Sequence, residues 1–198
     1  MSLKTDLLDA RAYGALAPSR VVLAETHISW VFVLDHDVFK VKKPVDLGFL
    51  DFRTIEARKL ACEAEARLNR RLAPDVYRGV VPVRRGADGR CRIGGHGSIV
   101  DWAVHMVRLP DERRADELLA RGELTRDSIA AVATRVAAFH AAAPASAEAT
   151  AFGAPSVVRA NVAENFAQTR DVALRYLEPA QAAEIGRASC RERVFITV

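Results

Sequence analysis

Cysteine and long apolar runs are both scarce in this sequence, which argues against a disulfide-rich protein and against a membrane-spanning one. Only three cysteines occur, Cys62, Cys91 and Cys190, and their spacing suits neither a disulfide framework nor a paired metal site. No apolar run approaches the ~20 residues that a membrane-spanning helix needs. The first residues, MSLKTDLLDA, lack the apolar core of a secretion signal. We therefore expect a cytoplasmic protein with free thiols and no membrane partner.

Clustered positive charge is lacking as well. The formal net charge of +4 at pH 7 would permit binding to a polyanion. However, the arginine pairs are interleaved with aspartate and glutamate along the chain; they are Arg70-Arg71, Arg84-Arg85 and Arg113-Arg114. This pattern is typical of a solvated surface, so we expect no nucleic-acid partner.

Two further kinds of site are not indicated. The segment 94–98, GGHGS, is rich in glycine, but no lysine follows it in the manner of a phosphate-binding P-loop, so we interpret it as a turn. Cys91 and His96 have no companions at metal-ligand spacing, and no zinc site is predicted. His140 ends an expected helix on its apolar side, which favours a packed histidine over a catalytic one.

What is present is a β-rich first half followed by helices, which predicts an α+β fold. Five strands are expected, in the runs VVLA, WVFVL, VFKVK, VYRGVVPVRR and IVDWAVHMVRL. One helix, about 54–72, lies between the third and fourth strands, with an apolar stripe that includes Leu60, Leu68 and Leu72. Further helices are expected at 111–121, 125–143 and 161–179, with a flexible connection at 141–156.

The third expected strand carries two lysines on one face. In VFKVKK, alternation places Val38, Lys40 and Lys42 on one side and Phe39 and Val41 on the other. If the second pair faces the core, the lysines face either a ligand or solvent. The pattern by itself leaves both possibilities open.

Four segments together resemble the aminoglycoside phosphotransferase-like family of bacterial kinases. They are ETHISWVFVL, VFKVKKPVDLGFLDF, EARLNRRLAPDVYRGVVPV and AVHMVRLP, and the resemblance covers roughly residues 20–180. It is greatest to the branch that is often fused to a P-loop ATP-binding domain. The resemblance implies an incomplete protein-kinase-like fold, with an antiparallel five-stranded N-lobe at 1–107 and the start of a helical C-lobe at 108–183.

The resemblance also implies a function and its cofactors. Kinases of this kind move the γ-phosphoryl group of ATP, with magnesium, to a hydroxyl on a small molecule. The nucleotide and an unidentified acceptor are therefore the expected partners. The alternative is a non-catalytic nucleotide-binding or regulatory kinase-like module.

A kinase-like lobe needs a lysine on its third strand to hold the nucleotide phosphates and a glutamate on the next helix to orient that lysine. Lys40 is the first choice for the lysine, although Lys42 stays open. Glu65 fits the family pattern better than Glu63, which would otherwise form a surface pair with Arg67.

The resemblance assigns four more residues to nucleotide binding. Val38 would contact the adenine, and Met106 lies in the connection between the lobes, a position carried over by location only. Thr26 and Ser29 stand where protein kinases have a glycine-rich loop, and their hydroxyl and backbone N–H groups would contact phosphate. A plain turn between strands is the competing interpretation.

The catalytic residues of the family are expected beyond residue 183. The family uses an HGD-type loop for its catalytic aspartate and for magnesium ligands, and no HGD tripeptide occurs in this sequence. The chain as given is therefore expected to be inactive. Residues Ile185 to Val194, IGRASCRERV, can be encoded by DNA similar to a sequencing-library adapter, so we interpret 184–198 as a non-native tail.

This interpretation predicts the result of resequencing the source gene across the codon for Glu184 with a different library chemistry. The reading frame should continue past this codon into an HGD-type loop, and IGRASCRERV should disappear. If genomic DNA encodes IGRASCRERV, the adapter interpretation is wrong.

Overall fold

The computed structural model describes residues 2–178 and 181, so the predicted tail at 184–198 lies outside the described residues. The chain divides into two compact units, Met1–Arg135 and Val136–Val198. The first unit contains the whole sheet, which ends at Val107. The predicted boundary between residues 107 and 108 thus coincides with the end of the sheet, whereas the division into units falls within a later helix.

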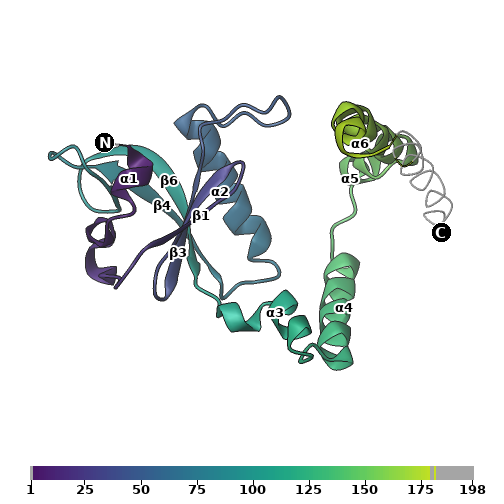
Figure 1. Cartoon of the computed structure of the whole chain (residues 1–198), viewed down its shortest axis with the longest axis horizontal. Helices are drawn as coiled ribbons and strands as arrows, with labels where there is room; N and C mark the ends of the chain where they lie inside the picture. Colours follow the sequence, from purple (N-terminus) through teal and green to yellow (C-terminus); the bar gives the residue numbers. More distant parts are fainter. Residues whose placement is uncertain (1, 179–180, 182–198) are drawn as a thin grey trace. The chain divides into compact units, whose positions relative to one another are not determined.

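The first unit is built on a curled antiparallel sheet (Figure 1). Its six strands follow the order β1-β2-β3-β6-β4-β5. Strands β1, β2 and β3 pair in the order of the sequence, and β6 lies between β3 and β4. The strands are β1 Val22–Glu25, β2 Ser29–Val33, β3 Asp37–Lys42, β4 Tyr77–Arg85, β5 Cys91–Ile93 and β6 Ser98–Val107. The prediction of an α+β fold is confirmed at this level.

The prediction of five strands is wrong, because the link between β4 and β6 contains the short strand β5. Cys91 pairs with Arg85 and Ile93 with Val83. The N–H of Cys91 also donates to the buried carboxylate of Asp6, at 3.1 Å. A strand of three residues in a turn-rich link is too short for a local apolar pattern to reveal it; its pairing with β4 and its contact with the N-terminal segment define it.

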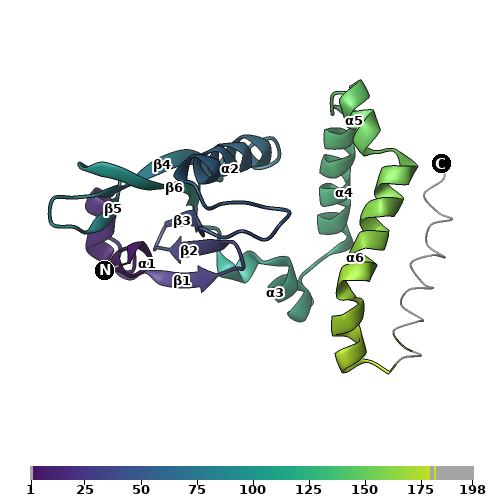
Figure 2. The ribbon, with the colours of Figure 1, turned by 90° about the horizontal axis from the view of Figure 1, so that it is seen from above.

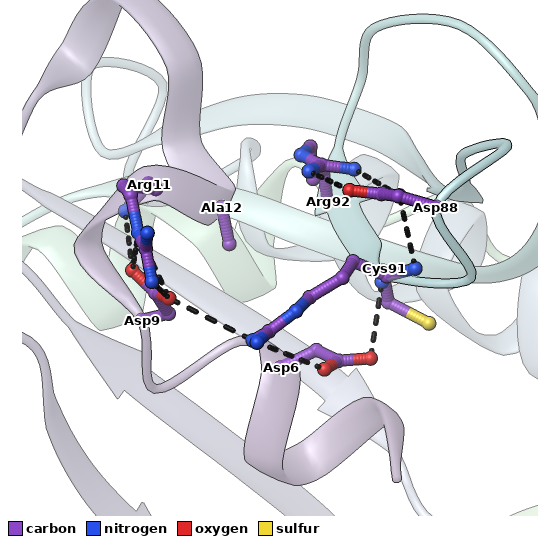
Figure 3. A pocket seen from close by; sticks show the side chains of 8 residues that line it. Asp6, Asp9, Arg11, Ala12, Asp88, Cys91 and Arg92 are labelled. Carbon is purple, nitrogen blue, oxygen red and sulfur yellow. Dashed lines mark hydrogen bonds and ion pairs between the residues drawn. The ribbon is translucent and has the colours of Figure 1, made fainter. Parts of the chain in front are cut away.

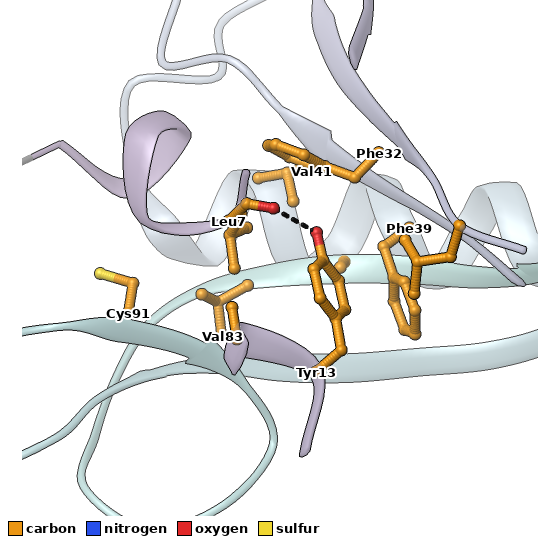
Figure 4. Packing of buried hydrophobic residues seen from close by; sticks show 10 residues of the cluster. Leu7, Tyr13, Phe32, Phe39, Val41, Val83 and Cys91 are labelled. Atoms are coloured by element: carbon orange, nitrogen blue, oxygen red, sulfur yellow. Dashed lines mark hydrogen bonds between the residues drawn. The ribbon is translucent and has the colours of Figure 1, made fainter. Parts of the chain in front are cut away.

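An N-terminal segment, for which no structure was predicted, closes one face of the sheet. It comprises α1 (Leu3–Asp6) and the 3₁₀ helix η1 (Ala10–Leu16). Its apolar side chains pack with those of the strands in one cluster (Figure 4), which includes Leu7, Tyr13, Phe32, Phe39, Val41 and Val83. The Tyr13 hydroxyl donates to the Leu7 carbonyl at 2.6 Å, so the phenol enters the core with its polar end satisfied.

The predicted helix after β3 is α2, Ile55–Asn69, and it contacts β4 and β6 (Figure 2). The side chain of Thr54 caps it by accepting from the N–H of Ala57 at 3.1 Å. Cys62 and Ala66 are buried against Val104 of β6. Small side chains therefore let the helix approach the sheet closely.

The predicted apolar stripe of α2 does not face the sheet. Leu60 and Leu68 are exposed to solvent, as is Leu72 just beyond the helix. The buried side instead combines Cys62 and Ala66 with charged residues that have partners on the sheet. The leucine spacing predicted the wrong buried face of α2, because the charged partners on the sheet are remote in sequence and a local pattern does not reveal them.

A buried ion pair joins the start of α2 to β6. Arg58 Nε donates to both carboxylate oxygens of Asp101, at 2.9 and 3.1 Å, and both side chains are almost fully buried. The same guanidinium donates to the carbonyls of Phe52 and Arg53. One side chain therefore connects α2, β6 and the segment that precedes the helix.

The remaining described elements are helical. They are η2 Asp111–Arg113, α3 Ala115–Ala120, α4 Arg126–Ala141, α5 Ala147–Phe152 and α6 Pro155–Tyr176. The flexible connection predicted at 141–156 contains α5, which Ser146 caps by accepting from the N–H of Ala149. The last predicted helix begins at Pro155 rather than Asn161, since proline suits the first turn of a helix. No helix in the described part of the chain is long and apolar enough to cross a membrane.

Replacing Arg58 should destabilise the whole first unit, because Asp101 would be left buried without its charge partner. We expect Arg58→Met to lower the free energy of unfolding by about 3–5 kcal/mol, measured by urea denaturation. Arg67→Met, on the exposed side of the same helix, is the matched control and should change it by less than about 0.5 kcal/mol. Equal effects of the two substitutions on the free energy of unfolding would show that the buried ion pair does not stabilise the fold more than a surface arginine does.

Candidate functional site

Strand β3 has one apolar face and one cationic face, as its alternation predicts. Phe39 and Val41 are buried in the cluster under the N-terminal segment. Lys40 and Lys42 lie on the opposite face, toward α2. The strand can present two charges because its other side chains belong to the core.

Both lysines bind the same carboxylate. Lys40 Nζ lies 2.9 Å from Glu65 Oε1, and Lys42 Nζ lies 2.5 Å from Glu65 Oε2. The side chain of Glu65 is 15% exposed, so this is a largely buried, charge-assisted arrangement. Glu63 is not part of it and instead pairs with Lys59 on the helix surface, at 3.6 Å.

The electrostatics of Glu65 reflect two opposing effects. Burial acts to raise the pKa of its carboxyl, but the hydrogen bonds from Lys42 and Lys40 outweigh burial and hold this pKa below its ordinary value. Neighbouring Cys62 is an unreactive thiol, because burial raises its pKa to about 11. Glu65 is therefore the anionic centre of the site.

An apolar surface adjoins the two lysines. Val38 lies directly opposite Met106 in the pairing of β3 with β6, and Lys40 lies opposite Val104. Directly paired residues share a face of the sheet, so Val38 and Met106 are on the same side as Lys40. The structure thus brings four predicted site residues, Val38, Lys40, Lys42 and Met106, to one face.

Thr26 and Ser29 form the tight turn between β1 and β2. The Thr26 N–H donates to the Ser29 carbonyl at 2.9 Å, and the Ser29 N–H donates to Thr26 Oγ1 at 3.0 Å. Thr26 is exposed, but its hydroxyl already holds the turn. Ser29 is fully buried opposite Lys42, and its Oγ has no hydrogen-bond partner among the residues that the structure describes. A contact between Ser29 and phosphate stays a prediction, and it would require this hydroxyl to become exposed.

A third lysine, which the sequence analysis did not select, lies at the same turn. Lys43 Nζ donates to the carbonyl of Thr26 at 2.6 Å and pairs with Glu25 at 2.6 Å. Hydrogen bonds from Lys4 and Lys43 lower the pKa of Glu25 to about 2. In the sequence, the run KVKK was the feature that could have pointed to Lys43. Alternation, however, places Lys43 on the opposite face from Lys42, and it does not predict which residues the long side chain contacts.

A second region of charged residues lies between the N-terminal segment and the link from β4 to β5. A pocket of about 140 Å³ there is lined by residues that include Asp6, Asp9, Asp88, Arg90 and Arg92 (Figure 3). Most of these charges are paired within the pocket, as in Arg92 with Asp88 at 2.5 Å. Across the described residues, no group of three or more histidine, cysteine, aspartate or glutamate side chains is placed to hold a metal ion.

Comparison with known proteins gives relatives that carry no functional description. Over 116 residues the chain is 36% identical to an uncharacterized protein of Mycobacterium bovis and to one of Mycobacterium tuberculosis. The match covers 59% of this chain, and the chain spans 22% of the length of these curated relatives. No family model matches the sequence. No solved structure matches it either.

The lowered pKa of Glu65 makes a testable prediction about stability and pH. A carboxyl whose pKa is lower in the folded state stabilises the fold above its unfolded value of 4.5 and loses that contribution as the pH falls through the folded value. Glu65→Gln should therefore lower the free energy of unfolding at pH 7 by roughly 1.5–3 kcal/mol, and the difference from the wild-type protein should shrink below pH 4.5.

Urea denaturation at several pH values measures this difference. Glu63→Gln on the exposed side of α2 is the control, and its effect should be small at every pH because its ion pair is at the surface. A destabilisation by Glu65→Gln that is independent of pH would contradict the assignment of an ionised Glu65.

Proposed function

We propose that this chain provides the ATP-binding lobe of a kinase-like phosphotransferase that transfers the γ-phosphoryl group of ATP to a hydroxyl on a small molecule. The observation that carries the proposal is the shared contact of Lys40 and Lys42 with Glu65, between the third strand and the helix that follows it. It has the residue types and the placement that a kinase uses to hold nucleotide phosphates.

The charges of this site suit a polyphosphate. Two ammonium groups face one carboxylate, so the site has one positive charge in excess. Because Glu65 holds both lysines in place before any ligand arrives, little reorganisation is needed when an anion binds. The low exposure of the two lysine side chains also strengthens their attraction for a phosphate oxygen.

The apolar surface beside the lysines suits a purine base. Val38 and Met106 are half-buried neighbours across two strands, on the same face as Lys40. A nucleotide whose phosphates contact Lys40 can therefore lay its base against aliphatic and thioether groups. Such a pairing of one apolar surface with a few polar groups is typical of cofactor sites.

The described donor set fits phosphate oxygens better than magnesium. Lysine ammonium groups donate hydrogen bonds and do not bind cations, and each oxygen of the carboxylate between them already accepts from one lysine. Magnesium prefers carboxylates together with phosphate oxygens, so ATP would arrive with its own magnesium. The catalytic aspartate and the magnesium-binding side chains would then be supplied beyond residue 183, by a longer form of the protein.

Nucleotide binding by the wild-type chain and by Lys40→Met tests the proposal. We expect ATP to bind, and the dissociation constant for ATP to rise about 10- to 100-fold in Lys40→Met, because a hydrogen bond between charged groups is lost. AMP, which lacks the outer phosphates, should be affected much less. Isothermal titration calorimetry measures all these constants.

Lys59→Met is the matched control, since it removes the same charge from the surface of α2. It should leave the ATP dissociation constant unchanged. Absence of ATP binding by the wild-type chain would refute the proposal. ATP binding by a full-length protein that transfers no phosphate to any hydroxyl compound would favour the non-catalytic nucleotide-binding module instead.

A further inference from the structure

The two lysines that share Glu65 differ sharply in their access to solvent. The side chain of Lys40 is 26% exposed, whereas that of Lys42 is 6% exposed. They also contact different oxygens of the carboxylate, Oε1 for Lys40 and Oε2 for Lys42. One lysine can therefore leave Glu65 while the other contact stays intact.

The surroundings of Lys42 hold it in place. Its Nζ lies 5.8 Å from the centre of the Phe52 ring, within the range of a cation–π contact. The directly opposite residue on β2 is the fully buried Ser29. Turning Lys42 toward an external ligand would break its contacts with both Glu65 and Phe52. Within the part of the chain that the structure describes, the Lys40 ammonium group forms a hydrogen bond and an ion pair with Glu65 and with no other residue.

We propose that Lys42 is a positioning residue, which keeps Glu65 in place and ionised when Lys40 turns from Glu65 to the phosphates of a bound nucleotide. This inference rests on the proposed function, because it assigns separate tasks to the two lysines of the same site. Lys40 is the lysine that contacts the ligand, and Lys42 acts through Glu65.

The physical reason lies in the cost of leaving a buried carboxylate alone. A carboxylate that loses its cationic partner in a poorly solvated site takes up a proton or destabilises the fold. With a single lysine, binding of phosphate would impose this cost each time. With Lys42 at Oε2, Glu65 keeps one charge partner, so Lys40 can contact phosphate without a change in protonation.

The other titratable groups around Glu65 do not change charge near neutral pH. Cys62, on the same helix, has a pKa raised to about 11 by burial. Tyr77, on β4, has a pKa raised above its ordinary value of 10.0, also by burial. Among the described residues, the cations that form ion pairs with Glu65 are Lys40 and Lys42. The terminal phosphate of ATP also titrates near this pH, but it is common to all variants, so the difference in proton uptake between a variant and the wild-type chain would report on Glu65.

Proton uptake on ATP binding tests the assignment. Calorimetric titrations with ATP and Mg²⁺ at pH 6.5, in buffers that differ in ionisation enthalpy, give the number of protons bound. Lys42→Met should take up a proton that the wild-type chain does not, approaching one per ATP. It should also bind ATP about tenfold more weakly, because the buried carboxylate would lose its last cationic partner. Lys42→Arg should restore wild-type behaviour.

A double variant shows where the proton goes. Lys42→Met combined with Glu65→Gln should lose the extra proton uptake, because no carboxyl remains to be protonated. A residue with a merely structural role would lower the melting temperature without changing the proton count. Equal proton uptake by the wild-type chain and Lys42→Met, or persistent uptake by the double variant, would overturn the assignment.

A measurement on the wild-type chain avoids any folding defect in the variants. In ¹³C spectra, ATP should shift the Lys40 side-chain signal, leave that of Lys42 nearly unchanged, and keep the Glu65 carboxyl signal at its ionised position. Movement of the Lys42 signal alone would refute the division of tasks. If the wild-type chain binds no ATP, the proposed function is refuted, and the inference about Lys42, which rests on it, is refuted as well.

Discussion

The contact of Glu65 with two lysines of β3 is the interaction on which the arrangement of α2 depends. A carboxylate this poorly exposed needs cationic partners, and in the described part of the chain both partners come from β3. Together with the buried pair of Arg58 and Asp101, it determines which side of the helix faces the sheet. Leu60 and Leu68 are turned to solvent as a consequence. Charge satisfaction, rather than apolar area, therefore orients this helix.

The sheet can carry such a site because its two faces have different tasks. The face under α1 and η1 contains the large apolar cluster and the phenol of Tyr13. On the other face only a small cluster around Cys62 and Val104 packs against α2. Strand β3 belongs to both faces, since Phe39 and Val41 secure it in the core while its lysines remain available. The strand that carries the lysines is thus held in the sheet by the packing of its opposite face.

The structure also changes how the turn between β1 and β2 is interpreted. Thr26 and Ser29 hold that turn through their own hydrogen bonds, and Lys43 reaches the same backbone. The unsatisfied hydroxyl of Ser29 lies beside Lys42, in the interior of the site rather than at its surface. The cationic character of the region therefore extends over Lys40, Lys42 and Lys43. The first two share Glu65, whereas Lys43 contacts Glu25 and the Thr26 carbonyl.

The sequence by itself determined the features that depend on neighbouring residues. Alternation in VFKVKK placed the lysines on one face of β3, and Thr54 with the following residues predicted the start of α2. Only the tertiary structure decided which side of α2 is buried, that β5 exists, and that both lysines meet Glu65. These depend on charges and backbone groups that are remote in sequence, such as Asp101 for Arg58 and Asp6 for Cys91. A local apolar pattern carries no information about such partners, because burying a charge is favourable only where its counter-charge is already in place.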